Sequence, residues 1–227
     1  MTPLFIHGAG FTGDTFEGQL KTFPGSHAPN LPGHTTPGAP ASIAEFADWT
    51  EQFIVEQNLQ NVVLCGHSMG AAVALEVALR GRSALKGIAL LGGGARLRVA
   101  PAILEGLERD FQNGARYIAG FFFADPTEER VDWAVRSMTS VGRDQTLRDY
   151  RACDAFDVLD RLDEISVPLL ALTGEYDKMT PPKYAHALAD RVPGAQARMI
   201  PGAGHFVMVE CPEETNAALR TFLSGAA

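Results

Sequence analysis

The sequence predicts an α/β fold: a mostly parallel sheet of about six strands, with helices on both faces and a small helical cap. One observation behind this prediction is that short apolar runs alternate with longer segments of helical spacing. Such an alternation is typical of strands joined by crossover helices, which form a parallel sheet. The other is that this alternation stops between Leu91 and Pro168, where only helical spacing remains. The 227 residues, 46% of them hydrophobic, suffice for one domain with a sizeable core.

The regular part of the chain contains apolar runs that predict strands and amphipathic segments that predict helices. Strands are expected at residues 3–7, 62–65, 88–91, 169–173 and 197–200, with a sixth, shorter strand near 26–29. Helices are expected at residues 42–57, 69–79, 182–191 and 212–223. The fourth strand is bounded by Pro168 and Gly174, which is typical of a short buried strand. The first helix begins with Ser42 and Glu45 at the spacing of a capping box.

Residues 95–163 are expected to form the cap, inserted between two parts of the core, residues 1–94 and 164–227. From about residue 98 to 160 the spacing predicts three or four short helices. The apolar residues of this insertion that are candidates for a pocket roof are Leu104, Leu107, Phe111, Tyr117, Phe121, Phe122, Phe123, Trp133, Met138 and Phe156. Most are expected to bury one another, and two or three to face a pocket that takes an acyl or ring-shaped group.

The most informative motif is Gly66-His67-Ser68-Met69-Gly70, between a predicted strand and a predicted helix. The pattern G-x-S-x-G in this setting is a nucleophile elbow, with the serine at the apex of a sharp turn. The turn requires a strained backbone at the serine, at a cost of about 1–3 kcal/mol, and its glycines let strand and helix pass closely. Because a glycine-rich turn can also be plain structure, the motif needs supporting context. Ser68 is the candidate nucleophile for chemistry at a carbonyl carbon.

A serine hydroxyl needs a base, and the base needs an orienting acid. Asp177 follows the fourth predicted strand, at the sheet edge where ligands bind, and is the candidate acid. Glu175 is the alternative acid, and an aspartate before two prolines can also simply begin a turn. His205 is the candidate base, since among the six histidines it alone follows both serine and acid at the start of a C-terminal helix. His67 is expected to point away from the serine.

Two N–H donors are needed where negative charge develops on a tetrahedral intermediate. The backbone N–H of Met69, next to the apex, is the first candidate for this oxyanion hole. The second is the backbone N–H of Ala9, in the glycine-containing loop after the first predicted strand. Gly10 or Phe11 takes this role if the loop is shifted by one residue. The alternative is that this loop only ends a strand.

These motifs, in this order, resemble the α/β-hydrolase superfamily. The matching pieces are His7-Gly8-Ala9-Gly10, Leu31-Pro32-Gly33-His34, Gly66-His67-Ser68-Met69-Gly70, Gly174-Glu175-Tyr176-Asp177 and Gly202-Ala203-Gly204-His205. They span nearly the whole chain, which looks like the small esterase, lactonase and C–C-hydrolase branch. The resemblance implies a metal-independent enzyme with a helical cap and a sheet shortened at its N-terminal edge. The chain departs from the family at Asn30 and Thr35, where Asp and Gly are common, which puts the local shape of that loop in question.

Composition narrows the expected partners. The net charge of −8, from 19 basic and 27 acidic residues, argues against nucleic acid or an anionic membrane. A small-molecule substrate is expected, with no cofactor and no metal, because H-E-x-x-H and glycine-rich phosphate loops do not occur. Cys65, Cys153 and Cys211 are too widely spaced to suggest a zinc site or disulfides. The N-terminal residues do not resemble a signal peptide and no apolar run is of bilayer length, so a cytoplasmic location is expected.

The leading hypothesis is a serine hydrolase that acts on small carboxylic esters, lactones or thioesters through an acyl-enzyme. The alternative is a C–C bond hydrolase or lyase that uses the same residues on a carboxylated substrate. The arginines that would bind such a carboxylate, or else lie solvated on the surface, are Arg96, Arg98, Arg116 and Arg143. A carrier-protein acyltransferase and a ligand-binding protein on the same scaffold are less favoured, because the chain is short and its set of catalytic residues is complete.

Overall fold

The sheet of the protein is parallel throughout. In the computed structural model, which describes residues 1–81 and 85–225, five strands pair in the order β1-β2-β3-β4-β5. Their bounds are β1 Thr2–Ile6, β2 Val62–His67, β3 Leu85–Leu91, β4 Leu169–Gly174 and β5 Gln196–Ile200. Each of the five overlaps a run that predicts a strand. The predicted α/β class is therefore confirmed.

Residues 26–29 do not form the sixth strand that the sequence predicts. This segment meets the sheet only through an isolated parallel bridge between Leu4 and His27, with backbone hydrogen bonds of 2.8 and 3.1 Å. Pro29 has no N–H with which to continue a ladder, so the pairing ends after one bridge. Within the described residues β1 is therefore an edge strand of a five-stranded sheet.

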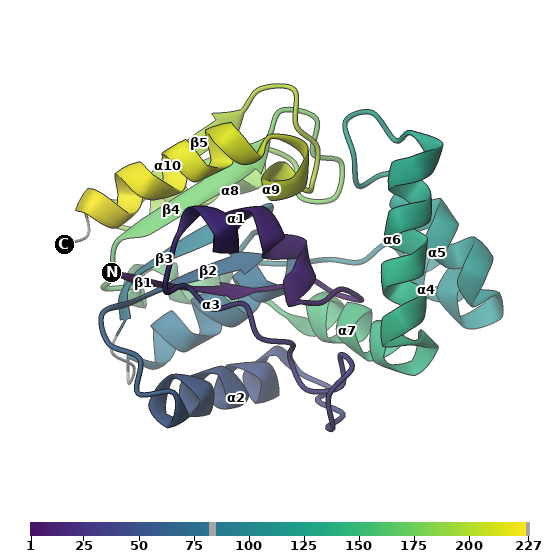
Figure 1. The fold of residues 1–227 in the computed structure, drawn as a ribbon, viewed down its shortest axis with the longest axis horizontal. Coiled ribbons are helices and arrows are strands. Elements are labelled where there is room, and N and C mark those ends of the chain that lie inside the picture. The colour runs from purple at the N-terminus through teal and green to yellow at the C-terminus, as the bar shows by residue number, and fades with distance from the viewer. Residues whose placement is uncertain (82–84, 226–227) are drawn as a thin grey trace.

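Helices cover both faces of the sheet (Figure 1). One face carries α2 Ile43–Glu56, α3 Met69–Arg80 and α8 Lys183–Arg191, and the other carries α1 Glu17–Thr22, α9 Val207–Glu210 and α10 Pro212–Gly225. Two 3₁₀ helices, η1 Gly13–Phe16 and η2 Leu159–Glu164, lie in the connections. Because both faces are covered, β2 and β4 are buried along their whole length, as parallel strands usually are. The hydroxyl of Ser42 accepts a bond from the Glu45 N–H at 3.2 Å and so caps α2 as predicted.

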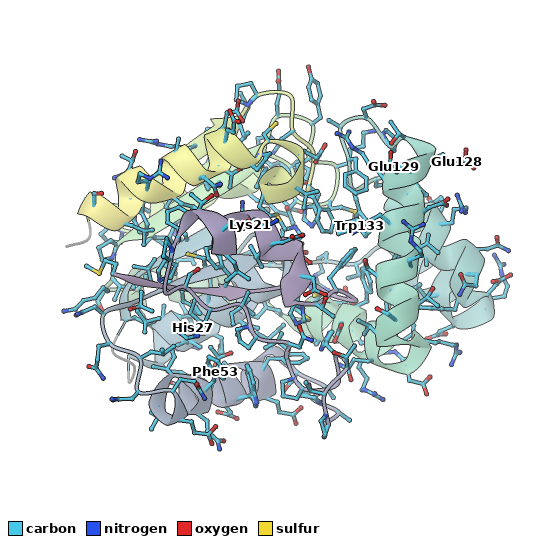
Figure 2. The ribbon with its side chains drawn as sticks, in the orientation of Figure 1. Lys21, His27, Phe53, Glu128, Glu129 and Trp133 are labelled. Carbon is cyan, nitrogen blue, oxygen red and sulfur yellow. The ribbon has the colours of Figure 1, made fainter. Side chains whose placement is uncertain are left out.

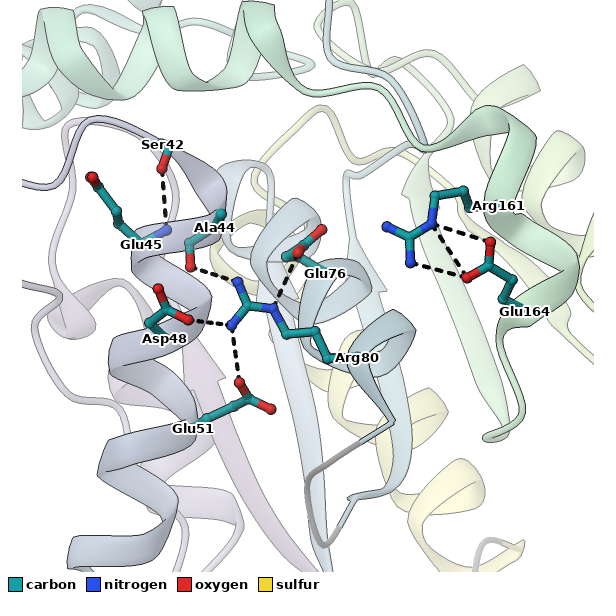
Figure 3. Close-up of polar contacts among 9 residues, drawn as sticks. All are labelled: Ser42, Ala44, Glu45, Asp48, Glu51, Glu76, Arg80, Arg161 and Glu164. Atoms are coloured by element: carbon teal, nitrogen blue, oxygen red, sulfur yellow. Dashed lines mark hydrogen bonds and ion pairs between the residues drawn. The ribbon is translucent and has the colours of Figure 1, made fainter.

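Arg80 joins α3 to α2 on one face of the sheet (Figure 3). Its guanidinium lies 2.6 Å from Asp48, 3.0 Å from Glu51 and 3.1 Å from Glu76, and it also donates to the Ala44 carbonyl at 2.8 Å. The Arg80 side chain is only 15% exposed, and its contacts with Glu51 and Glu76 are partly shielded from water, whereas Asp48 is exposed. Since α3 begins at Met69, directly after Ser68, this network stabilises the packing of the helix that follows the turn.

The chain between β3 and β4 forms four helices, which confirms the prediction of three or four. They are α4 Pro101–Arg109, α5 Phe111–Ala119, α6 Glu128–Val141 and α7 Arg143–Ala155. Figure 1 shows α4, α5 and α6 beyond the carboxyl ends of the strands, with α7 closer to the sheet. Trp133 projects from α6 toward the sheet (Figure 2) and packs against Phe11, Phe123 and Phe206. An aromatic cluster therefore joins this helical insertion to the loops at the strand ends.

Candidate active site

Ser68 lies between β2 and α3 with φ 53° and ψ −112°, in a region that L-residues rarely adopt. The surrounding backbone leaves no room for side chains at the two glycines of the turn. A Cβ on Gly66 would lie 2.0 Å from the Gly70 carbonyl oxygen, and a Cβ on Gly70 would lie 2.1 Å from the Ile6 carbonyl oxygen. The Ser68 N–H donates to the Leu91 carbonyl at 3.0 Å, which ties the turn to β3. The sharp turn that the motif predicts is thus present, with the serine at its apex.

His205 and Asp177 are hydrogen-bonded to each other beyond the ends of β4 and β5. The His205 Nδ1 lies 2.9 Å from Asp177 Oδ2, and both side chains are buried. The Thr180 hydroxyl donates to the same Oδ2 at 2.9 Å, while two backbone N–H groups of the following turn donate to Oδ1. Burial acts to raise the pKa of the Asp177 carboxyl, but the charge of His205 and the bonds from His205 and Thr180 outweigh it and hold that pKa below its usual value. Glu175, the alternative acid, instead accepts a bond from the Gly202 N–H.

Ser68 and His205 line one pocket, which is partly open to solvent. The Nδ1 of His205 is engaged by the carboxylate, so Nε2 is the ring nitrogen left for exchange with a hydroxyl. The Ser68 hydroxyl makes no hydrogen bond to any residue that the structure describes. The hydrogen bond between a catalytic hydroxyl and its base is often long in a free enzyme and shortens when substrate binds.

The loop after β1 is held so that one backbone N–H stays free. The Leu31 N–H donates to Nε2 of His7 at 3.0 Å, so the ring proton is on Nδ1, which donates to the Gly8 carbonyl at 3.0 Å. Burial and the nearby His34 lower the pKa of His7 to about 3, which keeps the ring neutral. In a planar trans peptide the C=O and N–H point in opposite directions. The Ala9 N–H therefore points away from the bonds that hold the Gly8 carbonyl.

The two alternative donors in this loop are already used. The Phe11 N–H donates to the Gly8 carbonyl at 3.3 Å, and the Gly10 N–H donates to Asp149 at 2.8 Å. Neither the Ala9 N–H nor the Met69 N–H has a hydrogen-bond partner among residues 1–81 and 85–225. Gly8 and Ala9 line the pocket beside Ser68. Of the three candidates in this loop, Ala9 is therefore the one with a free N–H.

Asp149 is a site-supporting residue that sequence reasoning missed. It lies on α7, is fully buried, and reaches across to the loop after β1. Its Oδ2 accepts from Gly10 N–H at 2.8 Å and lies 2.7 Å from His34 Nε2, and its Oδ1 accepts from the Gln145 side chain at 2.8 Å. Asp149 is 139 residues from Gly10 along the chain, and no local pattern marks that contact. The helical insertion is thus bonded directly to the loop that carries Ala9.

The two positions that depart from the family pattern contact each other. Thr35 has φ 66°, the conformation for which glycine is common there. The Asn30 side chain donates to the Thr35 hydroxyl at 2.9 Å, and its oxygen accepts from the Gly13 N–H at 2.9 Å. This loop is therefore held by side-chain bonds in place of the residues usual in the family.

Two further side chains that sequence reasoning did not assign to the site hold the His205 loop. The His67 Nε2 donates to the His205 carbonyl at 3.2 Å, and the two ring centroids are 4.8 Å apart. Burial and the nearby His205 lower the pKa of His67 well below its usual range, so that ring is neutral. The motif predicts that His67 points away from the serine, yet the residue lines the same pocket. Glu210 accepts from the N–H groups of Gly204 and Ala124, at 2.9 and 2.8 Å, and so joins the histidine loop to the insertion.

The insertion contributes a different pocket lining from the one expected. Of the apolar residues considered for a roof, Phe122 alone lines the pocket in the described part of the chain. The other insertion residues that line it are Leu97, Arg98, Val99, Tyr150 and Cys153. Helical spacing identifies which residues are buried, but it does not tell which neighbour buries them. Most of the other expected roof residues belong to the hydrophobic core or pack against it.

Two features are absent from the described residues. Residues 1–81 and 85–225 contain no group of three or more His, Cys, Asp or Glu side chains placed to hold a metal ion. Over the same residues, no helix combines the length and apolar composition that crossing a membrane requires.

A parallel α/β sheet with a strained serine at a strand–helix turn and a histidine–aspartate pair nearby defines a hydrolase-type enzyme. The model of the alpha/beta hydrolase family matches residues 4–218, and the chain belongs to that family. A solved thermophilic esterase is 32% identical with a TM-score of 0.92, over 100% of this chain and 90% of that one. The succinate-derivative hydrolase "(E)-2-((N-methylformamido)methylene)succinate hydrolase" of Acinetobacter baylyi is 26% identical, over 97% of this chain and 89% of its own. The pimeloyl-[acyl-carrier protein] methyl ester esterase of Neisseria meningitidis is 26% identical, over 97% and 92%. These similarities support an esterase-like hydrolase.

Proposed function

We propose that the protein is a serine esterase that hydrolyses small carboxylic esters, and in the same way lactones or thioesters, through an acyl-enzyme. The observation that carries this proposal is one pocket lined by Ser68 at φ 53° and by a His205 ring bonded to Asp177 at 2.9 Å. The similarity to proteins named as esterases supports an ester as the substrate. No cofactor or metal takes part in the proposed reaction.

The proposed reaction has two halves. In the first, Ser68 Oγ attacks the carbonyl carbon while His205 Nε2 takes its proton, and Asp177 stabilises the imidazolium. The oxyanion then accepts bonds from the N–H groups of Ala9 and Met69, each worth about 3–4 kcal/mol in the transition state. The carbonyl re-forms, the alkoxide leaves with the proton from His205, and an ester links the acyl group to Ser68. In the second half His205 takes a proton from the water that attacks the acyl carbon, and it returns this proton to Ser68 Oγ as the acid is released.

We also propose that residues 95–163 act as a cap over a core made of residues 1–94 and 164–227. Of these ranges, residues 82–84 and 226–227 lie outside the described part of the chain. Both the proposed oxyanion loop and the histidine loop are bonded to the insertion, through Asp149 and through Glu210. A cap bonded to both loops would hold the proposed oxyanion donors and the histidine in position over the substrate.

The test is turnover of p-nitrophenyl acetate and butyrate by the wild type, Ser68→Ala and Asp177→Asn. Ser68→Ala is expected to lower kcat by about 10⁴–10⁶, because it removes the attacking oxygen. Ser140→Ala, on the exposed surface of α6, is the matched control and is expected to keep full activity. A fluorophosphonate probe should label Ser68, as mass spectrometry of the peptide would show. Undiminished turnover by folded Ser68→Ala would contradict the proposal.

A further inference from the structure

The four arginines of the insertion that are candidates for binding a carboxylate differ in what they contact. Arg96 lies 3.6 Å from Asp157, Arg116 pairs with Asp132, and Arg143 lies 3.2 Å from Asp144. Arg98 is the fourth, and it lines the pocket that also contains Ser68 and His205. It has no ion-pair or hydrogen-bond partner within residues 1–81 and 85–225. Arg98 is solvent-exposed, so its unpaired guanidinium is free to reach the mouth of the pocket that the residue lines.

Tyr150 supplies a second polar group to the same pocket. It lies on α7 and is 5% exposed, yet its hydroxyl has no hydrogen-bond partner among the described residues. Burial raises the pKa of the Tyr150 phenol above its usual value, so the hydroxyl stays protonated and is available as a donor. The ring is buried, but the hydroxyl is not among the fully buried side-chain atoms that lack a partner, so it is accessible from the pocket and free to donate to a bound ligand.

The rest of the pocket favours an anionic group. None of the described residues that line it is an aspartate or glutamate, and most are apolar, including Leu97, Val99 and Phe122. Its one permanent charge is therefore the Arg98 cation, although the protein as a whole carries −8. A guanidinium binds a carboxylate through parallel N–H···O bonds, which are stronger than neutral hydrogen bonds.

We infer that Arg98 and Tyr150 form a carboxylate subsite, so that the preferred substrates are half-esters of dicarboxylic acids. This inference rests on the proposed esterase function and names its substrate class. The guanidinium binds the free carboxylate at the pocket mouth, the Tyr150 hydroxyl donates to it from the wall, and the ester end lies against Ser68. The distance between this subsite and Ser68 determines how many carbon atoms the preferred diacid contains.

The test compares esters that match in carbon number and differ only in a terminal carboxylate. Monomethyl succinate, glutarate and adipate are paired with methyl butyrate, valerate and caproate, and acid release is followed in a pH-stat. The wild type is expected to hydrolyse at least one half-ester with a kcat/KM about tenfold above its neutral partner, the effect of one charge-assisted bond. Added salt should reduce this preference, because charge attraction is screened.

The variants decide which residues carry the preference. Arg98→Gln is expected to lower kcat/KM for the preferred half-ester about tenfold, chiefly through KM, and to change the neutral ester less than about twofold. Tyr150→Phe should give a smaller loss of the same selectivity, and Arg96→Gln, whose partner is Asp157, is the matched control that should keep it. Equal activity on both members of every pair, or a preference that survives Arg98→Gln, would overturn the subsite while leaving the esterase standing. Failure to hydrolyse any ester would instead overturn the proposed function.

Discussion

Replacing Asp149 by leucine tests whether one buried carboxylate holds the insertion against the loop after β1. This side chain is fully buried and is bonded to Gly10, His34 and Gln145 at 2.7–2.8 Å. Leucine has a similar shape but accepts no hydrogen bond, so three buried donors lose their acceptor. Each such donor costs about 1–3 kcal/mol, and breaking a buried charged contact typically costs about 3–5 kcal/mol. We expect the free energy of unfolding to fall by about 3–5 kcal/mol, out of roughly 5–15 kcal/mol for a typical domain.

The measurement is urea unfolding at pH 7, followed by circular dichroism. Asp144→Leu is the matched control, since Asp144 lies on the same helix with a side chain 76% exposed and should lose at most about 1 kcal/mol. Asp149→Asn keeps one acceptor oxygen and should fall between the two. Where the variant is still folded, kcat for esters should fall as well, because Gly10 adjoins Ala9. Equal losses in the two leucine variants would refute the argument.

Two further predictions concern the histidines of the site. Gly92 has φ 57°, and an added Cβ would lie 3.0 Å from His205 Nδ1, so Gly92→Ala should lower kcat for esters at least about tenfold by displacing the ring. Gly194→Ala, at φ 74° with no described atom within 4 Å of the added Cβ, adds only backbone strain and should leave kcat unchanged; equal effects on kcat would contradict the prediction. Burial lowers the pKa of His7 from 6.5 to about 3 and that of His67 well below 6.5. Below pH 6.5 the unfolded chain therefore binds protons that the folded protein does not, and stability is lost as the pH falls. The expected slope near pH 5 is about 1.4 kcal/mol per pH unit for each ring; unfolding free energies in urea that are equal at pH 7 and pH 5 would contradict it.

Features set by neighbouring residues were predictable. The apolar runs predicted the five strands, because burial on both faces of a parallel sheet requires continuous apolar sequence. The G-x-S-x-G pattern predicted the turn at Ser68, since only small neighbours allow strand and helix to pass so closely. The prediction of a sixth strand was wrong, because the sequence of a short neutral segment does not show whether it forms one bridge or a ladder. The assignment of Ser68, Asp177 and His205 to catalysis stays a prediction.

The residues that hold the site together were not predictable. Asp149, His67 and Glu210 reach their partners across 139, 138 and 86 residues of chain, respectively. Whether Arg98 rather than Arg96 borders the pocket depends on how the insertion packs, and the two are alike as sequence.

By itself, the amino-acid sequence determined the fold class and the sharp turn that carries the serine. These depend on local backbone sterics and on the periodicity of apolar side chains, both of which act between near neighbours. Only the tertiary structure decided which N–H groups stay free, which carboxylates are buried and bonded to distant loops, and which arginine lines the pocket. Such choices are fixed by contacts between distant segments, whose geometry exists only once the sheet and the insertion have packed.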